Sequence, residues 1–271
     1  MENIRVIEKC GKYVGKNVVI LAGVHGDEVC GVKAFDELIP KINIEKGRVT
    51  FIYANLEAGK QNKRFVECNL NRCFLDDQPY ELKYSLEGKT AKAIIPYLKK
   101  ADIVLDLHSS KSSGNNPFLI CEEDCLEIIN CLSPKKVIMG IDNAQKGGSD
   151  GYMFNLGKQG ICVECGLHDS QESVEVAKQS ILNLLKKAES VGGDCEKYKD
   201  KKSYRVKYMY KSKNGMFKLA GKFQDFHQVN EKTLIGLDGD EKVYIEKGDV
   251  VMFPNEPKQI GKECFVIMKE E

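Results

Sequence analysis

Four polar side chains with metal-binding or catalytic chemistry stand at or near the ends of buried, strand-like segments. His25 and Glu28 follow the apolar run "VVILAGV", His108 closes "DIVLDLH", and Glu164 lies within "GICVECG". Imidazole and carboxylate groups are ligands of catalytic zinc, which takes three protein ligands and keeps a fourth position open. Two histidines and one carboxylate therefore predict an open zinc site.

The spacing of His25 and Glu28 suits a shared ion. Glu28 follows His25 by three residues, one helical turn, so both side chains can face the same point if the strand passes into a helix. Each residue alone also fits a structural role: His25 as a helix cap, His108 as a satisfied strand-end histidine, Glu28 as a first-turn acid. The chain has only four histidines, and two of them stand at strand ends beside acids, which favours the joint interpretation.

Further polar residues are expected at the same edge of a sheet. Glu164, a carboxylate flanked by apolar residues, must be paired or functional. Asn55 closes the run "FIYAN" and is a candidate substrate-binding residue, and Asn71 and Arg72 lie in "NLNR" on the following loop. Parallel α/β sheets place their sites beyond the carboxyl ends of the strands. We therefore expect these groups to cluster although they are far apart in the sequence.

The elements that position these residues alternate between strands and helices. Helical patterns cover about 28–38, 90–99 and a segment beginning near Val174. This alternation predicts an α/β domain with a mostly parallel or mixed sheet and helices on both faces. The predicted strands are the apolar runs 18–24, 49–55, 102–108, 117–120, 136–141 and 160–166.

The character of the chain changes at the Gly- and Lys-rich connector 191–203. Beyond it, "YRVKYMYKS" alternates with a period of two, and Gly and Asp turn signals separate short apolar runs. We therefore predict two domains, an α/β domain over 1–200 and a small all-β domain over 201–271.

Composition excludes several classes of protein. The 271 residues include 41 basic and 40 acidic side chains, a formal net charge of +1, which gives no general reason to expect nucleic acid or an anionic membrane. No apolar run is long enough to span a bilayer, and the first residues are not typical of a secretory signal. We expect a soluble, cytoplasmic protein.

The eleven cysteines are expected to be buried or half-buried free thiols, because a reducing compartment disfavours disulfides. Cys162 and Cys165 form a C-x-x-C, but on a strand they would point to opposite faces and could not share one metal.

Four motifs in order, "GVHGDE", "NLNR", "DLHSS" and "VECG", resemble the aspartoacylase/succinylglutamate desuccinylase family of zinc metallocarboxypeptidase-like hydrolases. The resemblance extends into the C-terminal segment "GLDGDEKVYIEKGDVVMFPN". It implies one Zn²⁺ per chain, with His25, Glu28 and His108 as its ligands. It also implies catalytic roles: Glu164 is the general base and acid, and Arg64 polarises the scissile carbonyl.

By the same resemblance, Asn71 and Arg72 hold a substrate carboxylate. Asp106, two residues before His108 on the same strand face, is a candidate to orient that histidine. Two positions depart from the family pattern: Asn69 stands where Asp is usual, and only Lys158 stands where some members have an Arg before the catalytic Glu. Tyr152 is a candidate hydroxyl contact to the substrate. These departures leave the acyl group and the amino acid open.

We therefore expect a zinc-dependent hydrolase that cleaves the amide bond of a small N-acyl amino acid carrying a free carboxylate. Two alternatives remain: a metallocarboxypeptidase acting on a peptide-like substrate, and a non-catalytic binding protein whose metal is structural. A fourth protein ligand, such as a cysteine or His168, would favour the last. No nucleic-acid or membrane partner is expected, and a homo-oligomer is left open.

Overall fold

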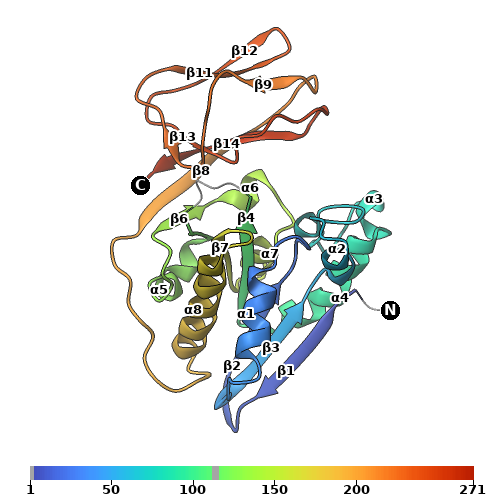
Figure 1. Ribbon diagram of the computed structural model, residues 1–271, viewed down its shortest axis with the longest axis vertical. Coiled ribbons are helices and arrows are strands. Elements are labelled where there is room, and N and C mark those ends of the chain that lie inside the picture. The colour runs from blue at the N-terminus through green and yellow to red at the C-terminus, as the bar shows by residue number, and fades with distance from the viewer. Residues whose placement is uncertain (1–2, 112–115) are drawn as a thin grey trace. The chain divides into compact units, whose positions relative to one another are not determined.

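The computed structural model describes residues 3–111 and 116–271, in which the chain forms two compact units (Figure 1). The first unit comprises Met1–Val137 and Lys146–Lys201, and the second comprises Ile138–Gln145 and Lys202–Glu271.

The first unit contains a mixed sheet with the strand order β1-β3-β2-β4-β7-β5. β3, β2, β4 and β7 are parallel, whereas β1 pairs antiparallel with β3 and β5 antiparallel with β7. The predicted mixed α/β class is confirmed. The strand bounds are β1 Arg5–Cys10, β2 Tyr13–Ala22, β3 Lys46–Tyr53, β4 Ile103–Ser110, β5 Phe118–Cys121, β6 Lys136–Met139, which spans the division between the units, and β7 Gln159–Leu167.

Helices cover both faces of this sheet, as expected. α4 and α7 pack on the face that carries Val19, Leu21 and Val104. α1 packs on the other face, where Gly31 lies against Ala22 and Leu107, and α8 packs beside α1 (Figure 1). The helices are α1 Cys30–Leu38, α2 Leu56–Lys60, α3 Tyr80–Lys83, α4 Leu86–Lys100, α5 Leu126–Ile129, α6 Ile141–Ala144, α7 Ser149–Asn155 and α8 Gln171–Lys187, with short 3₁₀ turns η1 Leu70–Arg72 and η2 Glu123–Cys125.

Two differences from the expected elements have simple causes. β1 was not predicted because "RVIEKC" mixes charged and apolar residues, and the strand is only partly buried. α7 was not predicted because seven residues are too few for a clear helical period.

The second unit is built mainly from antiparallel strands, as the alternating patterns indicate. β8, β14, β13 and β10 pair in that order, and β12, β11 and β9 form a separate sheet. Phe217, Ile235, Phe265 and Ile267 contribute to its apolar core. The strands are β8 Lys202–Lys211, β9 Phe217–Leu219, β10 His227–Gln228, β11 Thr233–Asp238, β12 Glu241–Ile245, β13 Val250–Met252 and β14 Glu263–Glu270.

The cysteines correct one expectation. Nine are free thiols, but Cys131 and Cys195 form a disulfide that links the segment after α5 to the connector after α8. The prediction failed because it rested on composition, and 64 positions separate the two residues in sequence. Cys162 and Cys165 are both free and buried, as expected.

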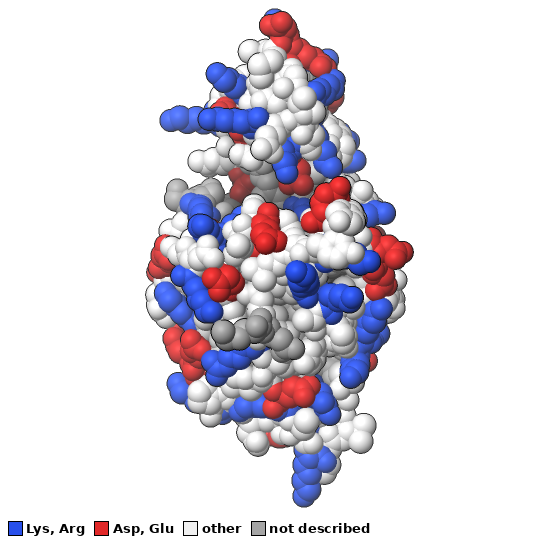
Figure 2. All heavy atoms as spheres, turned by 90° about the vertical axis from the view of Figure 1, so that its right-hand side faces the viewer, with Lys and Arg blue, Asp and Glu red and all other residues white. Residues whose placement is uncertain are grey.

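Across the described residues, none of the helices combines the length and the apolar character that crossing a bilayer requires. On the face drawn in Figure 2, basic and acidic side chains are interspersed.

Candidate metal and catalytic site

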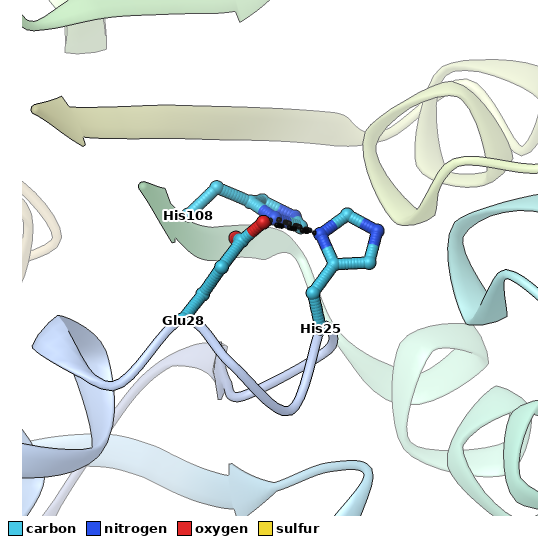
Figure 3. Close-up of side chains that lie close together, drawn as sticks. All are labelled: His25, Glu28 and His108. Carbon is cyan, nitrogen blue, oxygen red and sulfur yellow. Dashed lines mark hydrogen bonds and ion pairs between the residues drawn. The ribbon is translucent and has the colours of Figure 1, made fainter. Parts of the chain in front are cut away.

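His25, Glu28 and His108 converge at the carboxyl ends of β2 and β4 (Figure 3). Glu28 Oε1 lies 2.7 Å from His25 Nδ1, and Glu28 Oε2 lies 2.8 Å from His108 Nδ1. The two Nδ1 atoms are 3.2 Å apart. All three residues are buried. The sequence expectation that these three side chains meet therefore agrees with their positions.

The turn between β2 and α1 brings His25 and Glu28 together. The backbone N–H of Glu28 donates to the carbonyl of His25 at 3.1 Å, which closes one turn before α1 begins at Cys30. The helix thus starts two residues later than expected, and Glu28 precedes it rather than lying in its first turn. Gly26 allows close packing, since a Cβ there would lie 2.2 Å from the backbone of Ala58 in α2.

Neighbouring groups orient both histidine rings. Nε2 of His25 lies 2.9 Å from Asn69 Oδ1, which also accepts the backbone N–H of Asn71 at 2.9 Å. An atom that accepts a backbone N–H is the amide oxygen, so Nε2 of His25 carries the proton. Nε2 of His108 lies 3.2 Å from Asp106 Oδ2, the partner that the sequence suggested. Both rings thus turn Nδ1 toward Glu28.

The donor set fits a divalent cation. Two imidazole nitrogens and a carboxylate, whose ligand atoms lie within 4.8 Å of one another, match the ligands of catalytic zinc. Partners that hold the remote Nε2–H are the usual companions of metal-binding histidines. The two Nδ1 atoms lie 3.2 Å apart and each lies beside a Glu28 oxygen, so a single cation could be held by all three side chains.

The electrostatics of the metal-free site follow from burial and mutual attraction. Burial lowers the pKa of His25. Burial opposes the charged form of His108 as well, but Asp106 and Glu28 outweigh it and raise the pKa of His108 well above its usual value. Burial also opposes ionisation of Glu28, yet the two histidines hold its pKa well below the ordinary range. The site therefore keeps an ionised carboxylate, as a cation requires.

Two further groups hold the Glu28 carboxylate. The backbone N–H of Ser109 donates to Oε2 at 3.1 Å. The Arg64 guanidinium donates to Oε1 at 3.0 Å, and its side chain remains 48% exposed. Arg64 is therefore placed beside the candidate metal ligands and is also within reach of solvent.

Glu164 stands directly beside His108 in the parallel pairing of β4 and β7. The residue is half-buried, but its Oε2 atom is enclosed and has no hydrogen-bond partner in the described part of the chain. Burial, together with the negative charge of Glu28, raises the pKa of Glu164 to about 8. Paired strands thus place a carboxyl group that readily holds a proton next to the candidate metal ligands.

A buried acid that the sequence reasoning missed, Glu87 in α4, organises the loop after α2. Its carboxylate accepts the backbone N–H groups of Val66, Glu67 and Cys68 at 2.7, 3.2 and 3.1 Å. Asn55 donates to the same carboxylate at 3.2 Å and accepts from the side chain of Asn3. The Asn55 side chain is thus bound to Asn3 and Glu87. In the sequence, Glu87 is simply an acid in the first turn after the helix-capping Ser85. That position is also common for acids that only stabilise a helix start, so it did not indicate a contact with the loop.

Asn71 and Arg72 lie in the 3₁₀ turn η1, which the Asn69 side chain caps. Asn71 Oδ1 is buried without a hydrogen-bond partner among the described residues. Arg72 donates to the carbonyl of Asn71 at 2.6 Å. Gly147 packs against the Arg72 backbone, where a Cβ would come within 2.6 Å.

Three other residues named from the sequence have contacts outside the His25–Glu28–His108 group. The Tyr152 hydroxyl donates to Asp76 at 2.9 Å. Lys158 donates to the carbonyls of Lys99 and Ala101. His168 Nδ1 lies 2.9 Å from Ser109 Oγ, and its Nε2 lies 4.0 Å from Asp27.

His168 therefore does not complete a four-ligand site. Its candidate metal group is a different one, with Asp27 and Glu28. Lys111 already pairs with Asp27 at 2.6 Å. Within residues 3–111 and 116–271, the group formed by His25, Glu28 and His108 has three protein ligands.

Residues 14–188 match the family model for the succinylglutamate desuccinylase/aspartoacylase catalytic domain. Succinylglutamate desuccinylase from Vibrio campbellii is 25% identical, over 94% of this chain and 81% of its own length. N-acyl-aromatic-L-amino acid amidohydrolase (carboxylate-forming) B from Danio rerio is 25% identical, over 69% of each chain. The crystal structure of succinylglutamate desuccinylase from Vibrio cholerae superposes with a TM-score of 0.82 at 21% identity, covering 98% of this chain and 85% of that one.

Proposed function

Because this chain belongs to the succinylglutamate desuccinylase/aspartoacylase family, we propose that it is a zinc-dependent amidohydrolase that cleaves a small N-acyl amino acid with a free carboxylate. Its relatives are desuccinylases, aspartoacylases and acylamino-acid amidohydrolases, so hydrolysis of a linear amide is the shared chemistry. Their names differ in the acyl group and the amino acid.

One observation carries the zinc assignment. Asn69 accepts from Nε2 of His25, Asp106 lies 3.2 Å from Nε2 of His108, and both rings direct Nδ1 toward the Glu28 carboxylate. His25, Glu28 and His108 would hold the ion. Zinc in such a site acts as a Lewis acid, which polarises a carbonyl and acidifies water.

Glu164 is the residue best placed to move protons. As a carboxylate it accepts a proton from the attacking water, and as an acid it returns that proton to the leaving amine. Its pKa of about 8 in the metal-free chain suits a group that must both hold and release a proton near neutral pH.

Arg64, Asn71 and Arg72 bind and orient the substrate in this proposal. The partly exposed Arg64 guanidinium lies beside Glu28 and supplies positive charge where the scissile carbonyl gains negative charge. The buried amide oxygen of Asn71 has no hydrogen-bond partner within residues 3–111 and 116–271, which suits a polar substrate group. Arg72 supplies the geometry for a bidentate bond to a carboxylate.

The metal is tested by stripping the protein with a chelator, reloading zinc and measuring metal content and hydrolysis of N-acetyl and N-succinyl amino acids. We expect one zinc per chain and activity that returns with it. Dipeptides serve as control substrates: faster cleavage of dipeptides would identify a carboxypeptidase. Lack of stoichiometric metal together with lack of hydrolysis would reject the proposal.

Glu164→Gln tests the proton-transfer role. The amide keeps the size of the side chain but cannot accept the proton, so we expect kcat to fall by roughly 10⁴-fold or more while zinc content stays at one per chain. A variant that melts early yet remains active per folded molecule would show that Glu164 is structural.

A further inference from the structure

Two cysteine thiols bracket the segment that carries Asn69, Asn71 and Arg72. Cys68 precedes the segment and Cys73 ends it, and their Sγ atoms are 3.6 Å apart. Cys68 is half-buried and Cys73 is buried. We call Cys68 and Cys73 the thiol pair.

The thiol pair needs little rearrangement to form a bond. A disulfide places its sulfur atoms about 2.05 Å apart, so the two atoms must approach by about 1.5 Å. Their other contacts are weak: Cys68 Sγ lies 3.2 Å from Ser85 Oγ, and the Cys73 thiol donates to the Asn69 carbonyl at 3.4 Å. We propose that Cys68 and Cys73 form a reversible disulfide, with a low-molecular-weight disulfide such as glutathione disulfide as the oxidant.

The exchange has two steps. The Cys68 thiolate attacks glutathione disulfide, which forms a mixed disulfide at Cys68 and releases one glutathione thiolate. Cys73 then loses its proton to solvent, and its sulfur attacks the Cys68 sulfur and expels the second glutathione thiolate. The released thiolates take up the two protons lost by the protein. Overall, two protein thiols are oxidised and one glutathione disulfide is reduced to two glutathiones.

The structure assigns the order of the two cysteines. Cys68 is the more accessible thiol and meets the oxidant first. Burial and the neighbouring Cys68 raise the pKa of Cys73 above its ordinary value, which keeps Cys73 a thiol until a mixed disulfide lies beside it.

The bond would act on the residues between the two sulfurs. Asn69 holds His25 through its side chain and loses the Cys73 thiol at its carbonyl when the disulfide forms. Asn71 and Arg72 move with the same short segment. Displacement of positioning groups by about 1 Å costs roughly 10²-fold in rate. Formation of the bond is independent of the proposed function, whereas its effect on turnover rests on that function.

The test uses the full-length, zinc-loaded protein. It is incubated with excess glutathione disulfide, its remaining thiols are alkylated, and it is digested with trypsin without reduction. Trypsin cleaves after Arg64, Arg72 and Lys83, so the bond would join peptide 65–72 to peptide 73–83. We expect this linked pair to appear in the mass spectrum and to separate on reduction with dithiothreitol.

Kinetics are measured on the same samples with an N-acyl amino acid. We expect kcat/KM to fall by roughly tenfold or more on oxidation and to recover on reduction. Cys68→Ser should resist the oxidant, whereas Cys10→Ser, which removes an exposed thiol elsewhere, should respond like the wild type.

Peptides that carry only alkylated or glutathionylated Cys68 and Cys73 would overturn the proposal. If the linked peptides appear but kcat/KM does not change, the disulfide forms without affecting the site, and that part of the proposal would be wrong. If no N-acyl amino acid is hydrolysed at all, the proposed function fails, but the linked peptides still decide whether the bond forms.

Discussion

Asn69 replaces an expected acid yet keeps the contact that matters for the candidate metal. Its amide oxygen accepts from His25 Nε2 at 2.9 Å and from the backbone N–H of Asn71. A neutral oxygen fixes the ring as an aspartate would, but it adds no negative charge. The change therefore alters the basicity of His25 more than its orientation.

Asn69→Ala is expected to lower zinc affinity by roughly 10–100-fold, because His25 loses the partner that sets its tautomer. Asn69→Asp should retain or increase affinity. Competition with a chromogenic chelator measures both variants. Equal zinc affinity of wild type and Asn69→Ala would show that the contact does not support the metal.

The raised pKa of Glu164 predicts a pH-dependent stability of the metal-free chain. The pKa of Glu164 is about 8 in the folded chain, against an ordinary value of 4.5. Between these values the folded state keeps a proton that the unfolded state has released, so this stabilising contribution is present at low pH and is lost as the pH rises toward 8.

We therefore expect the melting temperature of metal-free Glu164→Gln, relative to wild type, to rise between about pH 5 and pH 8. Thermal melts of stripped protein measure this difference. Glu172→Gln, which changes an exposed acid in the first turn of α8, is the control and should show a much smaller trend. If the difference in melting temperature between wild type and Glu164→Gln stays constant over this pH range, the raised pKa of Glu164 would be contradicted.

The convergence of the candidate metal donors could be predicted because it follows from sheet topology. His25 and His108 stand at the ends of neighbouring parallel strands, β2 and β4. The partners of the loop residues could not be predicted in this way. Glu87 binds backbone groups about 20 positions away, and an acid near a helix start gives no signal of such a contact.

At the scale of elements, α4 holds the loop after α2 through the Glu87 carboxylate. That carboxylate is fully buried and accepts three backbone N–H groups as well as the Asn55 amide. The strands place the candidate metal donors, whereas the Glu87 side chain binds the backbone that leads into Cys68 and the following residues.

Glu87→Gln is expected to lower the free energy of unfolding by about 1–3 kcal/mol, because the new NH₂ group would face backbone donors. KM should rise as the loop loosens. Urea unfolding and steady-state kinetics measure the two effects. The control is Glu67→Gln in the same loop, since Glu67 is exposed and its carboxylate accepts the backbone N–H of Leu86 at 2.7 Å. Equal losses in the two variants would contradict a special role for Glu87.

At the scale of the whole molecule, the mixed α/β class and the β-rich C-terminal segment could be read from strand and helix periods. The Cys131–Cys195 disulfide could not, because pairing across 64 positions depends on how α5 and the connector after α8 pack. Composition describes a chain on average and cannot identify one pair of neighbouring residues.

The double variant Cys131→Ser/Cys195→Ser should be less stable than the oxidised wild type by about 2–4 kcal/mol, because the cross-link restricts the unfolded chain. Urea unfolding with and without reductant measures the difference. Reduced wild type should match the double variant. If reductant leaves the free energy of unfolding of the wild type unchanged, the Cys131–Cys195 cross-link would be contradicted.

The candidate zinc donors and the proposed substrate-binding residues lie on different parts of the fold. This separation has a consequence for how such proteins evolve. The candidate zinc donors stand at the ends of β2 and β4, whereas Asn71 and Arg72 lie on a segment anchored from α4. Mutations in that segment can change which molecule fits without disturbing the strands, because loops tolerate substitution better than cores do. During evolution, related proteins can therefore keep the same metal donors while their substrate preference changes. Exchanging residues 70–79 between relatives, which leaves Arg64 and Asn69 in place, is therefore expected to change the substrate preference while the candidate zinc donors and their partners stay as they are.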